Sequence, residues 1–375
     1  MTRRISEPTL RLLTPPRSSR HTTSVVNEPF ERSRRATTDH DATVLVPYAE
    51  LHATMRDILV REGMESARAD HCAQLFADSS RDGVPSHGLN RFGRFVAMIR
   101  NGMVDVHARP VRVASLGALE RWDGRRGPGN LNAHACMVRA IELAREHGVG
   151  AVGLGNSNHW MRGGNYGWQA ADAGVIGICW SNTLPNVPAW GTTVPLIGNN
   201  PLIIAVPRAS GHVVLDIAMS QFSYGALAVH RMRGEELPVD GGYDEQGRLT
   251  RDPAAIERTQ RLLPIGFWKG SGLAILLDVV GAVLSGGKAT HDFSTVPEQE
   301  SGQSQVFIAL DASALGAAGE TEAIVDGIVD ALHAGASAAG EEARYPGENT
   351  LRVRERSLAE GVPVNDDVWR EVRAL

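Results

Sequence analysis

The glycine run at residues 148–153, Gly-Val-Gly-Ala-Val-Gly, limits how this chain can fold more than any other feature. Its spacing matches the dinucleotide-binding pattern, which needs a strand before the glycines and a helix after them. Here the order is reversed, because residues 132–147 have helical spacing and residues 149–154 form an apolar, strand-like run. We therefore expect Gly148 to end a helix, and we do not expect this run to bind a dinucleotide.

The rest of the chain mixes strand-like and helical patterns. Apolar runs typical of strands are found at 111–116, 149–154, 175–182, 202–207, 212–218 and 304–310. Helices are expected at 47–63, 66–83, 89–103, 132–147, 165–174, 272–284, 320–338 and 365–375. These patterns predict an α/β protein with a mixed sheet and a small helical N-terminal unit. We place that helical unit at 44–110, the mixed α/β region at 111–345, and at 346–375 a C-terminal segment that packs back on the helical unit.

The first 43 residues differ in composition from the rest. They contain eight arginines and no lysine, many serines and threonines, and no period of helix or strand. Such a segment buries too little apolar surface to fold, so we expect residues 1–43 to form a disordered extension. The formal net charge of the whole chain is -5, which argues against a nucleic-acid-binding surface on the folded part.

Two further features bear on where the protein works. Cys72, Cys136 and Cys179 form neither a disulfide framework nor a spaced pair of metal ligands, which favours a reducing, cytoplasmic setting. The most apolar run, residues 271–287, is too short to span a bilayer and carries Asp278 in its middle. We therefore expect a buried helix there and no membrane partner.

The segment RDGVPSHGLNRF at 81–92 sets His87 between Ser86 and a glycine, in a loop between the second and third helices. Arg91 lies one helical turn further on, so the two side chains can converge. An imidazole can donate a proton to a developing alkoxide, and a guanidinium matches a carboxylate. The pair therefore suits a 2-oxo acid substrate. The alternative is that Ser86 or His87 only caps the third helix.

A second polar cluster, GNSNHWMRGGNYG at 155–167, follows an apolar strand and contains His159 and Arg162. Ligands of α/β proteins commonly bind after such strands, although an ordinary strand-to-helix loop has the same composition. His87, His159 and Asp216 have no ligand-spaced partner nearby in the sequence, so we expect no metal site.

Three more positions could contact a ligand. Asp216 lies in an apolar strand, where its carboxylate needs a partner such as a ribose hydroxyl or a core arginine. Lys269 precedes the apolar helix and could meet a phosphate or lie on the surface. Glu348 lies in the turn YPGENT, a position that usually faces solvent.

From about Val46 to its C-terminus the chain resembles the malate/L-lactate dehydrogenase type 2 family of nicotinamide-dependent oxidoreductases. The resemblance is carried by GVPSHGLNRF, GNSNHWMRGGNYGWQAADAGVIGICWSN, GNNPLIIAVP, DIAMSQFSYG, ELPVDGGYDEQGRLT, LPIGFWKGSG and SQVFIALD. The residues before Val44 have no counterpart in the family.

The resemblance implies a non-Rossmann nicotinamide-binding fold, a homodimer with sites near the subunit interface, and cofactor and substrate sites in the 111–345 region. It implies that NADH or NADPH reduces the C2 ketone of 2,3-diketo-L-gulonate or a close 2-oxo sugar acid, and that His87 protonates the ketone oxygen. Ser86, Arg91 and His159 correspond to family positions around the substrate and nicotinamide. We expect Arg162 to bind the substrate too, by holding its carboxylate together with Arg91. The cofactor contacts correspond to His212, Val213, Val214, Leu215, Asp216, Ile217, Ala218, Trp268, Lys269, Gly347 and Glu348.

Three alternatives remain open at this point. Within the family, a malate, lactate or ureidoglycolate type of specificity requires only small changes in the pocket. A metal-dependent hydrolase would use His87, His159 and Asp216, and would bind zinc. A nucleic-acid-binding protein would use the arginine-rich residues 1–43.

Overall fold

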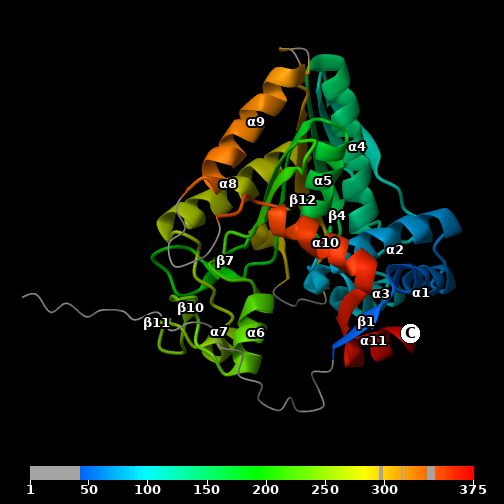
Figure 1. Cartoon of the computed structure of the whole chain (residues 1–375). Helices are drawn as coiled ribbons and strands as arrows, with labels where there is room; N and C mark the ends of the chain where they lie inside the picture. The colour runs from blue at the N-terminus through cyan, green and yellow to red at the C-terminus, as the bar shows by residue number, and fades with distance from the viewer. Residues whose placement is uncertain (1–42, 295–298, 314, 317, 336–342) are drawn as a thin grey trace, which may run out of the picture. The chain divides into compact units, whose positions relative to one another are not determined.

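The computed structural model describes residues 43–294, 299–313, 315–316, 318–335 and 343–375 (Figure 1). The predicted disordered extension lies outside these residues, apart from Thr43, which begins strand β1 (Thr43–Val46). The helices and strands of the fold are those of the described residues.

The centre of the fold is a seven-stranded mixed sheet. Its strands follow the order β2 (Val111–Leu116), β3 (Leu119–Asp123), β4 (Val149–Ser157), β12 (Gln303–Leu310), β5 (Ile176–Ser181), β8 (Leu202–Val206) and β9 (Val213–Ile217). All neighbours are antiparallel except β3 and β4, which are parallel. The predicted mixed α/β class is therefore confirmed.

The glycine run has the predicted local structure. Helix α4 (Gly129–His147) ends at Gly148, which has a φ of 80°, and β4 follows directly. Glycine tolerates this left-handed conformation without the steric cost that a Cβ would bring. The glycines of β4 allow close packing instead, since a Cβ on Gly150 would lie 2.1 Å from the carbonyl oxygen of Ala140 in α4.

Helices cover both faces of the sheet (Figure 1). Helices α4 and α5 (Gly164–Asp172) pack on one face, and α8 (Trp268–Ser285) packs on the other. Adjacent residues of β12 point to opposite faces, as expected for a strand: Phe307 joins the core under α4 and α5, whereas Val306 joins the core under α8.

The N-terminal helices form a separate core with the end of the chain. This core contains α1 (Tyr48–Arg61), α2 (Ser66–Arg81) and α3 (Leu89–Arg100), together with α11 (Asp366–Arg373), whose Trp369 is buried in it. Strand β1 pairs with β13 (Val362–Asn365). The remaining elements are η2 (Pro85–His87), β6 (Val187–Pro188), β7 (Pro195–Ile197), α6 (Tyr224–Arg233), β10 (Gly242–Tyr243), β11 (Leu249–Thr250), α7 (Pro253–Thr259), η3 (Thr290–Asp292), α9 (Ala318–His333) and α10 (Glu348–Glu360).

Helix α8 corrects one prediction, because it is not buried. Only about a third of it is buried (33 %), although its length and apolar composition would allow it to cross a membrane. Leu276 is 60 % exposed and Val283 is 65 % exposed. On α9, Ile328 is 66 % exposed. Apolar composition alone suggested burial, but the sheet covers only one side of this helix.

Candidate active site

The loop that carries His87 is fixed by the contact between α2 and α3. Helix α2 ends at Arg81, a short 3₁₀ turn spans Pro85–His87, and α3 begins after Gly88. A Cβ on Gly88 would lie 2.2 Å from Ser80 Oγ, and that hydroxyl accepts a hydrogen bond from the Leu89 amide. Only a glycine therefore permits this close approach, which places His87 at the start of α3.

The two predicted histidines lie together. The rings of His87 and His159 stack with their centroids 5.8 Å apart, and Ser86 Oγ lies 3.0 Å from His87 Nδ1. His159 Nδ1 accepts a hydrogen bond from the Met161 amide, so in the neutral ring Nε2 carries the proton. The structure thus joins two loops that are more than 70 residues apart in the sequence.

Burial and nearby arginines lower the pKa values of both rings. Burial is the main cause for His87, and Arg91 and Arg162 lower its pKa further, whereas the Asp216 carboxylate raises it. The pKa of His159 is well below its ordinary value because of burial, Arg91, His87 and Arg94. The pKa of His87 therefore responds to one carboxylate and two guanidinium groups.

Asp216 and Arg162 line a cavity of about 410 Å³, which we call the β9 pocket. Of the predicted cofactor positions, Val214, Leu215, Asp216 and Gly347 line it. Its other lining residues are Val84, Arg162, Trp168, Arg344, Tyr345, Pro346 and Thr350. The Val214 amide donates to the Pro346 carbonyl (2.8 Å), which joins β9 to the turn before α10.

Asp216 has protein partners in this pocket. Its Oδ2 accepts a hydrogen bond from the Gly164 amide (3.0 Å) and lies 3.6 Å from Arg162 Nε. Of the two partners weighed for this carboxylate, the structure shows the arginine. Arg162 Nε is buried and has no hydrogen-bond partner among the described residues.

Asp82 is the second partner of Arg162 and was not predicted from the sequence. Its side chain is 1 % exposed and contacts Arg81 Nε (2.8 Å), Arg162 Nη1 (2.7 Å) and Arg354 Nη2 (2.7 Å). Hydrogen bonds and charge from these guanidinium groups hold the pKa of Asp82 well below its usual range, although burial opposes them. Asp82 directly precedes the His87 loop, and this is the one signal that could have pointed to it.

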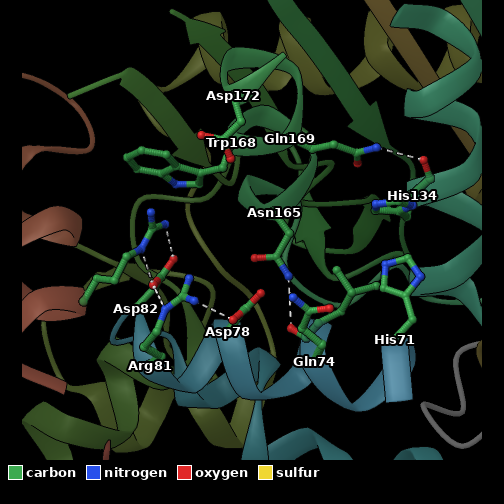
Figure 2. A pocket seen from close by; sticks show the side chains of 12 residues that line it. His71, Gln74, Asp78, Arg81, Asp82, His134, Asn165, Trp168, Gln169 and Asp172 are labelled. Carbon is green, nitrogen blue, oxygen red and sulfur yellow. Dashed lines mark hydrogen bonds and ion pairs between the residues drawn. The ribbon is translucent and has the colours of Figure 1, made fainter. Parts of the chain in front are cut away.

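Figure 2 shows Asp82 at the edge of a further cavity of about 380 Å³ between α2, α4 and α5. Most of its lining residues are polar, and they include Arg81, Asp78 and the neighbouring rings of His71 and His134. Arg354 also lines this cavity and stacks over Trp168, 4.4 Å from the ring centroid. Arg354 thereby ties α10 to the base of the His87 loop.

Arg91 and His159 line another cavity, of about 300 Å³, which we call the Arg91 pocket. Its described lining residues are Arg91, Arg94, His159, Thr183, Leu184, Pro185, Asn186, Asn199, Tyr224, Gln260 and Glu300. Arg91 Nη2 pairs with Glu300 Oε2 at 3.0 Å. Glu300 is 209 residues away from Arg91, so no local pattern could have revealed it.

The other predicted positions lie elsewhere. His212 stands at the start of β9, where its Nε2 lies 3.0 Å from Asp172 Oδ1. Val213, Ile217 and Ala218 are half-buried in or beside β9. Trp268 and Lys269 begin α8 and line neither the β9 pocket nor the Arg91 pocket.

Glu348 begins α10 and is less exposed than its turn suggested. Its side chain is 12 % exposed and pairs with His333 (3.1 Å) and Arg352 (2.7 Å). Among the residues that the structure describes, no three His, Cys, Asp or Glu side chains gather in a group suited to a metal ion.

The chain matches a known family of oxidoreductases. The malate/L-lactate dehydrogenase family profile matches residues 46–373, so the chain belongs to this family. It is 45 % identical over 331 residues to 2,3-diketo-L-gulonate reductase of Citrobacter koseri, covering 88 % of this chain and 99 % of that protein. The reductase of the same name from Klebsiella pneumoniae is 44 % identical, with the same coverage.

A solved structure shows the same fold. Sulfolactate dehydrogenase from Methanocaldococcus jannaschii superposes with a TM-score of 0.82 at 25 % identity, covering 88 % of this chain and 95 % of that one. The chain is therefore an oxidoreductase of the malate/L-lactate dehydrogenase family.

Proposed function

We propose that this protein uses NADH or NADPH to reduce the C2 ketone of 2,3-diketo-L-gulonate to 3-dehydro-L-gulonate. The identity of 45 % to a reductase of that name, over nearly its whole length, supports this substrate. The observation that carries the proposal is that His87, although it lines neither pocket, interacts with residues of both. His87 stacks on His159 of the Arg91 pocket, and its pKa responds to Asp216 of the β9 pocket.

For the cofactor we propose the β9 pocket, without a Rossmann glycine turn. The buried Arg162 Nε lacks a hydrogen-bond partner among the described residues and lines this pocket, so a polar group of a ligand fits beside it. A Cβ on Gly347 would lie 3.1 Å from the Val214 amide nitrogen, so glycine allows the turn before α10 to approach β9 closely in this pocket. A bound reduced nicotinamide supplies the hydride. Val214, Leu215 and Gly347 would hold the cofactor.

The Arg91 pocket would bind the 2-oxo acid. Arg91 would hold the carboxylate, and the His159 Nε2 proton would be available to a substrate oxygen. As C2 gains hydride, its oxygen takes the proton of the His87 imidazolium, which leaves a neutral ring. Ser86 Oγ, 3.0 Å from His87 Nδ1, would orient this ring. Arg162 is paired with Asp82, so we assign it to positioning His87 and Asp216.

We further propose a homodimer formed through the exposed apolar residues of α8. The side chains of Leu276, Val279 and Val283 are 60 %, 50 % and 65 % exposed, an unusual face for a monomer. In such a dimer Trp268 and Lys269, at the start of α8, would lie near the interface, where they could contribute to a cofactor site. The three cysteines are free thiols, which supports a reducing, cytoplasmic location.

The test is the loss of nicotinamide absorbance at 340 nm as the purified protein meets a panel of 2-oxo acids. The panel contains 2,3-diketo-L-gulonate, oxaloacetate, pyruvate and an oxidised ureidoglycolate, each with NADH and with NADPH. The proposal predicts the highest kcat/KM for 2,3-diketo-L-gulonate. A higher value for oxaloacetate or pyruvate would favour a malate or lactate type of specificity. The proposal would be refuted if neither NADH nor NADPH were oxidised in the presence of any of these acids.

A further inference from the structure

The Arg91 pocket contains a carboxylate of its own. Glu300 is 5 % exposed, and its Oε2 lies 3.0 Å from Arg91 Nη2 and 3.4 Å from Arg94 Nη2. Its Oε1 accepts a hydrogen bond from Gln303 Nε2 at 2.8 Å. A buried carboxylate in this position is held by three side chains and cannot turn away from the pocket.

Glu300 changes the charge that a ligand would meet. Among the described residues that line the pocket, Arg91, Arg94 and Glu300 carry the formal charges, and His159 has a pKa far below its ordinary value. A pair of arginines alone would suit a substrate with two carboxylates. With Glu300 between them, the described lining keeps the equivalent of one positive charge.

The pocket is also lined by neutral hydrogen-bonding groups. Thr183 Oγ1 donates to Asn199 Oδ1 (2.8 Å), and the Asn199 backbone amide donates to Asn186 Oδ1 (2.9 Å), so these side chains are already oriented. Tyr224 and Gln260 line the pocket too. Burial raises the pKa of Tyr224 to about 12, which keeps its hydroxyl protonated as a donor. Such groups match hydroxyls better than a second carboxylate.

We propose that Glu300 determines substrate specificity by favouring a 2-oxo acid with one carboxylate and a hydroxyl-bearing tail over a dicarboxylate. This inference rests on the proposed function of the Arg91 pocket as the acid-binding site. A carboxylate has about four acceptor positions, and three protein donors occupy three of them. The remaining position can accept a substrate hydroxyl, whereas a second substrate carboxylate would be repelled.

The test compares the binding of two acids by titration calorimetry with NADH present, where neither acid can be reduced. L-gulonate is a 2-hydroxy acid with one carboxylate and a hydroxyl-bearing tail, whereas L-malate is a 2-hydroxy acid with two carboxylates. We expect the wild-type protein to bind L-gulonate more tightly. In Glu300→Gln the dissociation constant of L-malate, divided by that of L-gulonate, should fall by about tenfold or more. The variant lacks the negative charge that repels the second carboxylate of L-malate from several ångströms away.

Two further variants show whether a change in this ratio comes from the charge of residue 300 or from a folding defect. Glu300→Asp keeps the charge and should retain the preference of the wild type. Arg94→Gln removes a positive charge and should shift the ratio the opposite way, further toward L-gulonate. A ratio unchanged in Glu300→Gln, a wild-type preference for L-malate, or binding of neither acid would overturn the inference. Because binding is measured, a shifted ratio supports the role of Glu300 even where the 340 nm assay refutes the proposed reduction.

Discussion

Replacing Asp82 by Asn should lower both the stability and the activity of this protein. The carboxylate is the shared partner of Arg81, Arg162 and Arg354, at nitrogen–oxygen distances of 2.7–2.8 Å. Asn keeps the shape of Asp but leaves three guanidinium groups close together without the carboxylate that they share. Removing one partner from a buried ion pair costs about 3–5 kcal/mol, and we expect a loss of this size in the free energy of unfolding.

The stability lost in Asp82→Asn should depend on pH, in a direction set by the pKa of Asp82. Interactions with three arginines hold the pKa of Asp82 well below its usual value, which is about 3.9 in an unfolded chain. A depressed pKa contributes stability that is complete above the unfolded value and is lost as the pH falls from there through the folded value. The difference between wild type and Asp82→Asn should therefore be constant near neutral pH and shrink in acid below about pH 4.

The assay is urea unfolding of both proteins at neutral and acidic pH, with kcat measured alongside. Asp57→Asn is the matched control, since its partner Arg56 also lies within hydrogen-bond distance but the Asp57 side chain is 58 % exposed. This control should leave the unfolding midpoint nearly unchanged. A midpoint for Asp82→Asn as close to wild type as that of the control would refute the reasoning. The same conclusion would follow if the loss of stability grew in acid.

Three other predictions concern the proposed site and the apolar face. Burial lowers the pKa of His87, so kcat/KM for ketone reduction, which needs the imidazolium, should rise as the pH falls toward this pKa. Oxidation of the 2-hydroxy acid should show the reverse dependence in initial rates at 340 nm. In Gly164→Ala the new Cβ would lie 2.5 Å from Asp216 Oδ2 and would push this oxygen away from the Gly164 amide, which donates a hydrogen bond to it. The affinity for NADH, measured by fluorescence, should therefore fall by about tenfold or more. The double variant Leu276→Asp with Val283→Asp should convert a dimer to a monomer in light scattering, whereas Leu116→Asp, at a position 80 % exposed on β2, should not. A wild-type monomer would contradict the proposed interface.

Local chemistry explains which parts of the fold the sequence could predict. The helix before Gly148 and the strand after it follow from helical spacing, a glycine cap and an apolar run, all within about 25 residues. Helix α8 has an equally clear apolar pattern, yet its burial was predicted wrongly. Composition does not record which side of a helix the rest of the fold covers, and only the packing against the sheet decides this.

The residues of the candidate site likewise fall into those that the sequence indicates and those that only the folded chain reveals. His87 and His159 stand out because glycine-rich loops present them between regular elements. Asp82 and Glu300 do not stand out, although they fix the arginines of both pockets. Arg162 pairs with Asp82 across 80 residues and Arg91 pairs with Glu300 across 209, so these pairs become visible only in the folded chain.

In the proposed reaction the His87 imidazole gives a proton to the ketone oxygen of a 2-oxo acid. The most direct measurement is the turnover of His87→Gln in the 340 nm assay, together with its NADH dissociation constant from fluorescence. We expect kcat to fall by roughly 10²–10⁴-fold while NADH binding stays unchanged, because general acid catalysis contributes this much. Turnover equal to that of the wild type would exclude His87 as the proton donor.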